Sequence, residues 1–445
     1  MNRIITLLIC FSAFGQASAQ VVAADSVMQH VKGNRLSVGG YGEACYSRNF
    51  YSDHVSRYSQ PEEHSSDPSH GKFDIPHAVI YLGYDFGKGW SFGTEVEFEH
   101  GGNGLAYEKE DEEGGEWEQE VEKGGEVELE QFWIQKTFSR AANLRAGHIV
   151  VPVGLNNAYH EPLNFFTVYR PEGEDVILPS TWHETGVSLF GAVGHDWSRV
   201  NYEAYVTAGL NANGFDRNTW VAGGKQGMFE VDNFTSPAYV ARLNYRGIPG
   251  LRLGASFYYL HNAASNSDKP HTYSFNVPVR IWSVDAQYQH RYFIARGNLM
   301  GGYVGNSDQL SAKNNRLSSS SPYSRLAPVA KRAVSYGAEA GLRLRNMAVT
   351  NKMPDLIPFV RYEYYNAQQE VVVSSYNLKA ADPRLKTSMW VAGLNYRPLP
   401  YLVVKADYTK RRIGDGSYKN ENEFALGVAF TGWFLSDNKF KRLRK

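Results

Sequence analysis

Five ionisable residues in the middle of the chain belong to the types that bind metal ions: His148, His160, Glu161, His183 and Glu184. Imidazole and carboxylate groups are common metal ligands, but these residues follow none of the compact spacings of metal sites, and no cysteine lies among them. The sequence therefore favours hydrogen-bonded loop anchors at these positions. We expect neither a metal nor a cofactor.

The side-chain types of a hydrolytic triad also occur, in Ser320, His290 and Asp285. The spacing of these residues in the sequence does not indicate that they lie close enough in space to act as nucleophile, base and orienting acid. We therefore do not expect an enzyme.

Charged residues at alternate positions of apolar segments could act on ions instead, because a channel selects ions through fixed charges along its wall. The basic candidates for the wall of such a lumen are Arg199, Arg242, Arg246, Arg252, Arg296, Arg343, Arg345, Arg361 and Lys405. Acidic residues share these polar faces: Glu95, Glu97, Glu203, Asp285, Glu339, Glu363 and Asp407. A wall of mixed charge also suits a general channel, since opposite charges across a lumen orient water and solutes.

These residues lie on about sixteen segments whose polarity alternates with the period of a β-strand. The expected strands span 36–47, 73–86, 90–99, 127–138, 143–151, 184–191, 199–210, 237–246, 251–260, 279–288, 293–304, 334–345, 357–366, 388–396, 401–410 and 423–434. Short joins such as 87–89 alternate with long polar ones such as 50–72, 100–126 and 151–183. This alternation predicts an all-β, antiparallel, up-and-down transmembrane barrel, with short periplasmic turns and long extracellular loops.

The two faces of the expected strands differ chemically, as lipid on one side and water on the other require. In the segment 251–260, Leu253 and Phe257 alternate with Arg252 and Ser256. A soluble sandwich would show the same periodicity. Aromatic residues near the strand ends, such as Trp390, match an interfacial girdle and favour the barrel.

The ends of the chain complete the expected organisation. Residues 1–19 have the basic, apolar and small-residue regions of a signal peptide, followed by a periplasmic segment at 20–35, the barrel at 36–434 and a basic tail at 435–445. We therefore expect a location in the bacterial outer membrane. The chain carries 46 basic and 46 acidic residues, a balance that gives no sign of nucleic-acid binding.

An acidic run covers 108–130. Like charges repel and keep a segment extended, so we expect a solvated outer loop. The alternative is that divalent cations bridge the run to anionic surface polysaccharide. The expected partners of the barrel are therefore this polysaccharide and the lipid of the outer membrane.

Several motifs between residues 145 and 186 resemble the phosphate-selective porin O and P family. They are Arg145-Ala146-Gly147-His148, Val151-Pro152-Val153-Gly154, His160-Glu161-Pro162, Phe165-Phe166-Thr167-Val168-Tyr169-Arg170-Pro171-Glu172 and Trp182-His183-Glu184-Thr185-Gly186. The resemblance implies a homotrimeric channel of sixteen strands whose third outer loop folds into the lumen. Strand counting places that loop at 151–183.

The expected constriction lies on this loop and comprises His160, Glu161, Arg170, Glu172, Glu174 and Asp175. Arg170 would act as a filter near the axis, or it would anchor the loop to a wall carboxylate such as Glu203. The expected function is passive diffusion of small hydrophilic solutes, including anions such as phosphate. Two alternatives stay open: a channel for sugars or other uncharged nutrients, and a closed barrel that serves as a surface adhesin or structural protein.

Overall fold

The computed structural model describes residues 35–54, 57, 61–101, 105–110, 118–123, 125–226, 231–315, 327–348, 353–414 and 420–436. The expected signal peptide, nearly all of the expected periplasmic segment and all but the first two residues of the basic tail lie outside the described residues. Among the described helices, none combines the length and apolar character needed to cross a membrane.

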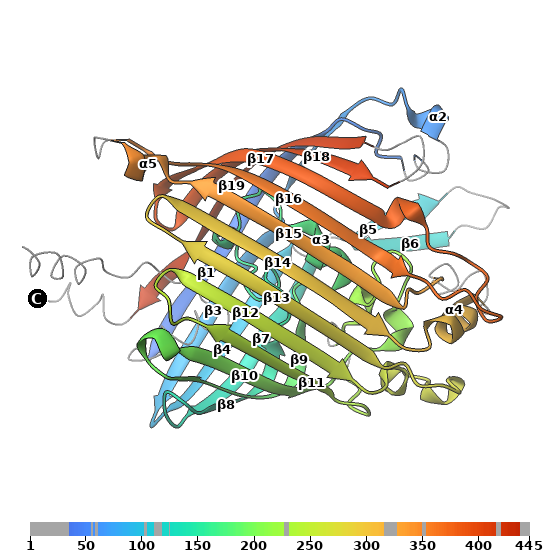
Figure 1. The fold of residues 1–445 in the computed structure, drawn as a ribbon, viewed down its shortest axis with the longest axis horizontal. Helices are drawn as coiled ribbons and strands as arrows, with labels where there is room; N and C mark the ends of the chain where they lie inside the picture. The colour runs from blue at the N-terminus through green and yellow to red at the C-terminus, as the bar shows by residue number, and fades with distance from the viewer. Residues whose placement is uncertain are drawn as a thin grey trace, which may run out of the picture.

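One antiparallel sheet forms a closed barrel (Figure 1). Its strands are β1 (Leu36–Asn49), β2 (His70–Asp74), β3 (His77–Gly87), β4 (Trp90–Glu99), β7 (Glu126–Thr137), β8 (Asn143–Val150), β9 (His183–Val193), β10 (Val200–Thr207), β11 (Ala238–Tyr245), β12 (Leu251–Leu260), β13 (Val279–Gln289), β14 (Phe293–Val304), β15 (Arg332–Leu342), β16 (Asp355–Glu370), β17 (Lys386–Leu399), β18 (Leu402–Ile413) and β19 (Asn420–Ser436). Pairing of β1 with β19 closes the ring.

β2 and β3 share one position in the ring. The first half of β1 pairs with β3 and its second half with β2. Pro76 lies between β2 and β3, and a proline has no N–H to donate to a strand ladder. The seventeen strands of the sheet therefore fill sixteen positions, and the up-and-down barrel predicted from the sequence is confirmed.

Connections of different length lie at the two ends of the barrel. At one end, β3 and β4 are joined by Lys88 and Gly89, whose positive φ angles of 55° and 80° suit a tight two-residue hairpin turn. Helix α5 (Leu344–Met347) lies at this end too (Figure 1). The connection 343–354, at the end with the short turns, is longer than the connection 414–419, at the opposite end. For these two connections, the predicted alternation of short turns and long loops is wrong.

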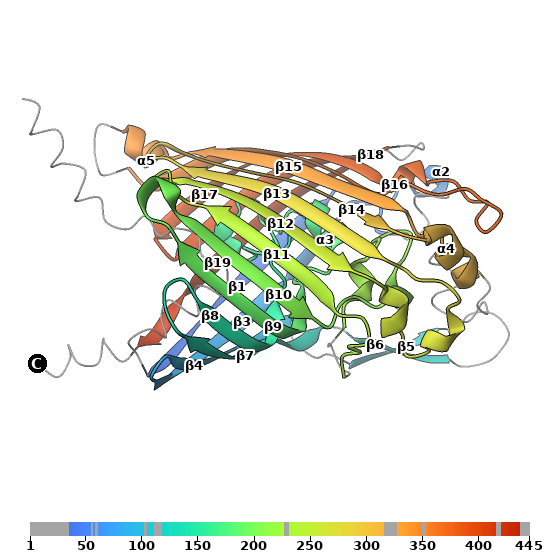
Figure 2. The same cartoon turned by 60° about the horizontal axis from the view of Figure 1, so that its bottom comes forward.

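The opposite end carries α2 (Pro61–His64), α4 (Ser307–Asn315) and the hairpin of β5 (Leu105–Glu110) with β6 (Glu118–Lys123) (Figures 1 and 2). Figure 2 also shows the strands running obliquely around the barrel, as closure of a sheet requires. The hairpin forms part of the acidic run found in the sequence, which otherwise falls partly outside the described residues.

The outer face of the barrel is apolar. On β12, Leu253 and Phe257 are 44% and 46% exposed, whereas Arg252 and Ser256 point inward and are buried. Trp390 is also exposed on the outer face. The predicted assignment of the two faces is confirmed here, and an exposed apolar belt of this kind matches a hydrocarbon surrounding.

The main core is inside the barrel rather than between layers. Val151, Ile177 and Trp182 from the third long connection pack with Phe215 and Trp220 from the fourth. The strands therefore enclose a largely filled interior at this level, and the route left for solutes depends on how these connections pack.

Candidate pore constriction

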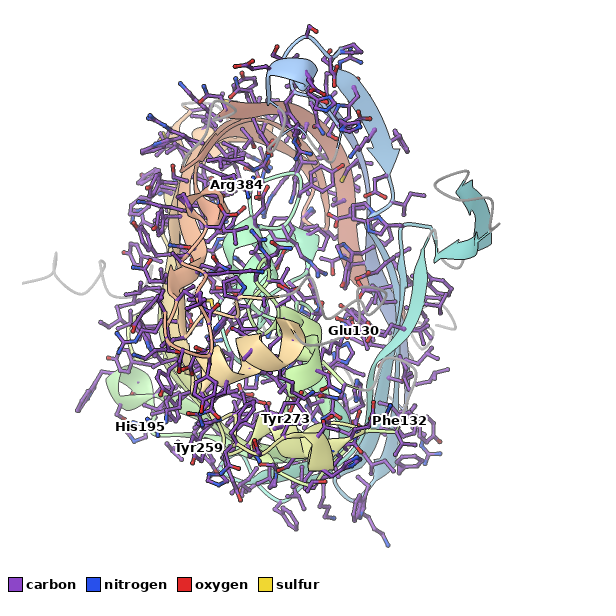
Figure 3. All side chains as sticks on the ribbon, turned by 90° about the vertical axis from the view of Figure 1, so that its right-hand side faces the viewer. Glu130, Phe132, His195, Tyr259, Tyr273 and Arg384 are labelled. Atoms are coloured by element: carbon purple, nitrogen blue, oxygen red, sulfur yellow. The ribbon has the colours of Figure 1, made fainter. Side chains whose placement is uncertain are left out.

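The third long connection, residues 151–182 between β8 and β9, lies inside the ring of strands. It contains a short 3-10 helix, η3 (Pro162–Asn164), and α3 (Glu172–Ile177). Figure 3 views the barrel from the end with the long connections and shows α3 in the interior, surrounded by the strands. Most residues of this connection are buried. We call it the third loop.

Lys405 on β18 anchors the first half of the third loop. Its ammonium group donates hydrogen bonds to the carbonyl oxygens of Pro162, Phe165 and Thr167 at 2.6, 3.1 and 2.8 Å. It also lies 4.1 Å from the centroid of the Phe165 ring, within range of a cation–π contact. One wall cation thus satisfies three carbonyl groups that have no strand partner.

Arg242 on β11 holds the start of the loop in the same way. Its guanidinium donates to the carbonyl oxygens of Pro152 and Gly154 at 3.3 and 2.9 Å, and to Asp285 at 2.8 Å. Arg252 donates to the other oxygen of Asp285 at 2.5 Å. These basic residues, predicted to line a lumen, are buried against the loop and a wall carboxylate.

Glu174 fixes the loop's own fold. Its carboxylate accepts hydrogen bonds from the backbone amides of residues 155–157 at 2.8, 2.7 and 3.1 Å, and from Asn298 of β14 at 2.5 Å. Gly154 approaches so closely, at φ +87°, that an added Cβ would lie 2.4 Å from the carboxylate. Burial raises the pKa of Glu174 to about 7 although the backbone hydrogen bonds oppose the shift.

Arg170 lies against the wall. Its guanidinium donates to the hydroxyl of Thr181 at 3.1 Å and to that of Tyr41 at 3.3 Å, and lies 3.8 Å from the Glu97 carboxylate. The side chain is only 7% exposed. The sequence named Glu203 as a possible anchor, but Glu203 accepts a hydrogen bond from the neighbouring Tyr205 instead. Arg170 thus has the surroundings of an anchor.

His160 and Glu161 are buried where the loop meets the wall. The Nδ1 of His160 lies 3.0 Å from the carbonyl oxygen of Asn157, which can only accept, so Nδ1 carries the proton. Burial, with help from the nearby Arg170 charge, lowers the pKa of His160 to about 3. Glu161 accepts hydrogen bonds from the hydroxyls of Tyr81 and Thr431 at 3.1 and 3.2 Å.

Glu172 and Asp175 belong to α3. Glu172 binds Arg411 of β18 and accepts a hydrogen bond from the hydroxyl of Tyr365 at 3.0 Å. Asp175 is enclosed, and burial raises its pKa to about 6. Of the six residues proposed for the constriction, Glu172 borders both cavities described below.

The remaining basic candidates form two groups. Arg296 binds Glu339, Arg361 lies 3.3 Å from Glu339 and 3.2 Å from Glu363, and Arg246 contacts the hydroxyl of Tyr159 at 3.5 Å. Arg246 directly follows β11, which ends at Tyr245. Arg199, Arg343 and Arg345 also lie outside the strands. Arg199 is the residue that follows the short helix before β10, and β15 ends at Leu342, so Arg343 and Arg345 fall at and within α5. One strand expected from the sequence begins at 199 and another ends at 345, beyond the ends of β10 and β15. The prediction that these three residues lie on strands of the wall is therefore wrong.

Two cavities lie beside the third loop. One, of about 310 Å³, lies between residues 167–172 and the wall formed by β1, β2 and β16 to β19. The other, of about 620 Å³, is lined by Arg217, Asp382 and Arg384 of the long connections. Both are lined by Tyr51, Glu172 and Arg411.

Arg411 was missed because the predicted strand ended at 410, one residue too early. It has the same parity as Lys405 and Asp407 on β18, so the alternation would have identified it as inward-facing had the strand been continued.

Comparison with known proteins adds to this geometry. No family model matches the chain. An uncharacterised protein of Aquifex aeolicus is 27% identical over 415 residues, covering 93% of this chain and 82% of the relative. Among solved structures, OmpF of Salmonella typhi matches with a TM-score of 0.53 at 11% identity, over 90% of this chain and 98% of that one.

Two further outer-membrane structures match at similar levels. The outer membrane channel DcaP of Acinetobacter baumannii has a TM-score of 0.52 at 11% identity, over 89% of this chain and 97% of that one. OprB of Pseudomonas putida has a TM-score of 0.50 at 10% identity, over 89% and 94%. The chain has the fold of an outer-membrane porin. This fold and its apolar outer belt place the barrel in a bacterial outer membrane.

Proposed function

We propose that this protein is a porin that lets small hydrophilic solutes diffuse passively across the outer membrane. The observation that carries the proposal is the pair of cavities beside the third loop, both lined by Tyr51, Glu172 and Arg411, which we take as the route for solutes. Polar side chains around a route replace the hydration shell of a passing solute, whereas the apolar outer face repels it.

The charges along this route favour weak ion selectivity. Arg217 and Arg384 both contact Asp382, at 2.6 and 2.7 Å, and Arg411 lies between Glu172 and Glu421. A dedicated phosphate site needs cations whose charge is available to the anion. Since these basic residues face carboxylates, we propose general passage of small solutes, with phosphate as one of them and uncharged nutrients such as sugars as others.

We also propose a homotrimer, as the resemblance of the third-loop motifs to phosphate-selective porins implies. In gentle detergent the protein should migrate as an oligomer that becomes a monomer after boiling. A single monomeric species under gentle conditions would argue against the trimer without affecting the channel.

Planar-bilayer recording tests the channel itself. The wild-type protein should conduct, and Arg411→Glu should move the reversal potential in a salt gradient toward cation preference, because the change replaces a positive charge with a negative one at the shared border of the cavities. Arg345→Glu, on an exposed helix outside the strands, is the matched control and should leave the potential unchanged. A folded protein that never conducts would support the closed-barrel alternative.

A further inference from the structure

Two wall carboxylates and one loop imidazole converge inside the barrel at a place the proposed function does not use. Glu95 comes from β4, Glu130 from β7 and His160 from the third loop. All three residues are fully buried, and one donor atom from each lies within 4.8 Å of the others. Figure 3 shows Glu130 on the inner side of the wall.

The Nε2 of His160 faces this point and has no hydrogen-bond partner among the described residues. The carboxylates of Glu95 and Glu130 lie within hydrogen-bonding range of each other, and Glu130 also lies within range of Thr181. The Nε2 of His160 lies 3.7 Å from a carboxylate oxygen of Glu130. A buried polar atom left unpaired is unfavourable. An unpaired imidazole nitrogen buried beside two adjacent carboxylates indicates a place where a cation can bind.

A β-bulge brings Glu130 to this point. Glu95 pairs with Gln131 while the next residue, Val96, pairs with Leu129, so Glu130 has no residue opposite it. Glu130 and Gln131 are both buried, whereas Leu129 and Phe132 are both exposed on the outer face. Bulges re-aim side chains next to functional sites, and this one adds a second carboxylate beside Glu95.

Neighbouring groups orient two of the three residues. The Nδ1–H of His160 donates to the carbonyl oxygen of Asn157, which leaves the lone pair of Nε2 directed at Glu130. The second oxygen of Glu95 accepts a hydrogen bond from Gln131. Metal-binding histidines commonly donate their other N–H to a backbone carbonyl, and metal-binding carboxylates are commonly hydrogen-bonded in turn.

The local charge is consistent with a divalent cation. The neighbouring Glu97 lies 3.8 Å from Arg170 and accepts a hydrogen bond from Tyr41. Three carboxylates, of Glu95, Glu97 and Glu130, against the one guanidinium of Arg170 leave an excess of two negative charges when all are ionised. A bound divalent ion would neutralise this excess.

We propose that Glu95, Glu130 and His160 bind a divalent transition-metal ion of the Zn²⁺ type that fastens the third loop to the wall. An imidazole among the donors disfavours Mg²⁺ and Ca²⁺, which prefer oxygen ligands. Three protein donors with a water molecule as the fourth ligand is a common zinc arrangement, with metal–ligand distances of about 2.0–2.2 Å. The donors would therefore move closer together on binding.

The test uses the full-length protein in mild detergent, stripped with a chelator and titrated with Zn²⁺ alone. One equivalent should bind per chain. X-ray absorption at the zinc edge should show one imidazole among oxygen ligands. Glu130→Gln and His160→Ala should each weaken binding by at least about 100-fold, beyond the loss typical of outer-shell changes. His195→Ala, on an exposed turn, controls for surface binding and should bind as tightly as the wild type.

Absence of stoichiometric Zn²⁺ binding would overturn the proposal, as would equal binding by Glu130→Gln and the wild type. In that case the two carboxylates share a proton. The absorption spectrum needs no variant, so a substitution that prevents folding leaves the test intact, and a spectrum without imidazole would also overturn the site. Bilayer conductance tests the channel separately, since a barrel without metal can still conduct.

Discussion

The guanidinium of Arg170 lies 3.8 Å from the carboxylate of Glu97, and both side chains are almost fully enclosed. This pair joins the third loop to β4. A buried ion pair loses much when one partner is removed, because the other charge stays buried and unpaired. The loop's position therefore depends on Arg170 as an anchor.

Arg170→Gln should lower the free energy of unfolding by about 3–5 kcal/mol, measured by tryptophan fluorescence during guanidinium unfolding in detergent. Arg170→Lys keeps the charge and should lose less. If Arg170→Gln is as stable as the wild type and only the reversal potential changes, Arg170 acts as a filter rather than as an anchor.

Lys405→Met should release the first half of the third loop, because three carbonyl groups lose the wall cation that binds them. We expect larger and noisier single-channel currents as the loop moves from its docked position. Lys410→Met, on the exposed part of the same strand, should leave the currents unchanged. Identical currents from Lys405→Met and the wild type would show that the loop does not narrow the route.

The outer face gives a prediction about stability in the membrane. Leu253→Arg puts a charge on the exposed apolar face of β12 and should destabilise the barrel by about 2–4 kcal/mol. Thr409→Arg, which lines the cavity beside the third loop, should be tolerated. Equal losses of folded protein, measured by the heat-dependent shift on gels, would contradict the assignment of the faces.

The third loop should be held more tightly at mildly acidic pH. Burial raises the pKa of Glu174 from 4.5 to about 7, so the docked loop binds a proton more strongly than an undocked one. The corresponding stability is fully present below pH 4.5 and is lost as pH rises through about 7. The nearby negative charge of Asp285 acts in the same direction.

Hydrogen exchange of the amides at 155–157, corrected for the intrinsic pH dependence of exchange, should show greater protection at pH 5 than at pH 8. Glu174→Gln removes the ionisable group and should make the protection independent of pH. Protection that increases with pH in the wild type would contradict the assignment.

The orientation of the barrel can be tested at the hairpin formed by β5 and β6. An epitope inserted between these strands should be detected on intact cells, because the longer connections lie at that end and long loops of such barrels face outward. A tag inserted next to α5, at the other end, should be detected only after the membrane is broken. The reverse pattern would invert the topology.

The sequence alone determined the barrel and the identity of its faces. Residues two apart on a strand share a face regardless of what surrounds them, so the alternation of Leu253 with Arg252 could be read without any knowledge of neighbours. Strand ends were less certain, because nothing local stops the alternation. Arg343 was placed on a strand that ends before it, and Arg411 was omitted from one that includes it.

The interior was decided by the tertiary structure. That Arg170 faces Glu97, that Lys405 binds three loop carbonyl groups, and that a bulge turns Glu130 inward beside Glu95 and His160 all depend on the register between strands and on the path of the third loop. These contacts join residues far apart in the chain. The closure of the barrel and the burial of charge inside it decide which residues meet in these contacts. No local pattern of residues encodes either of these two effects.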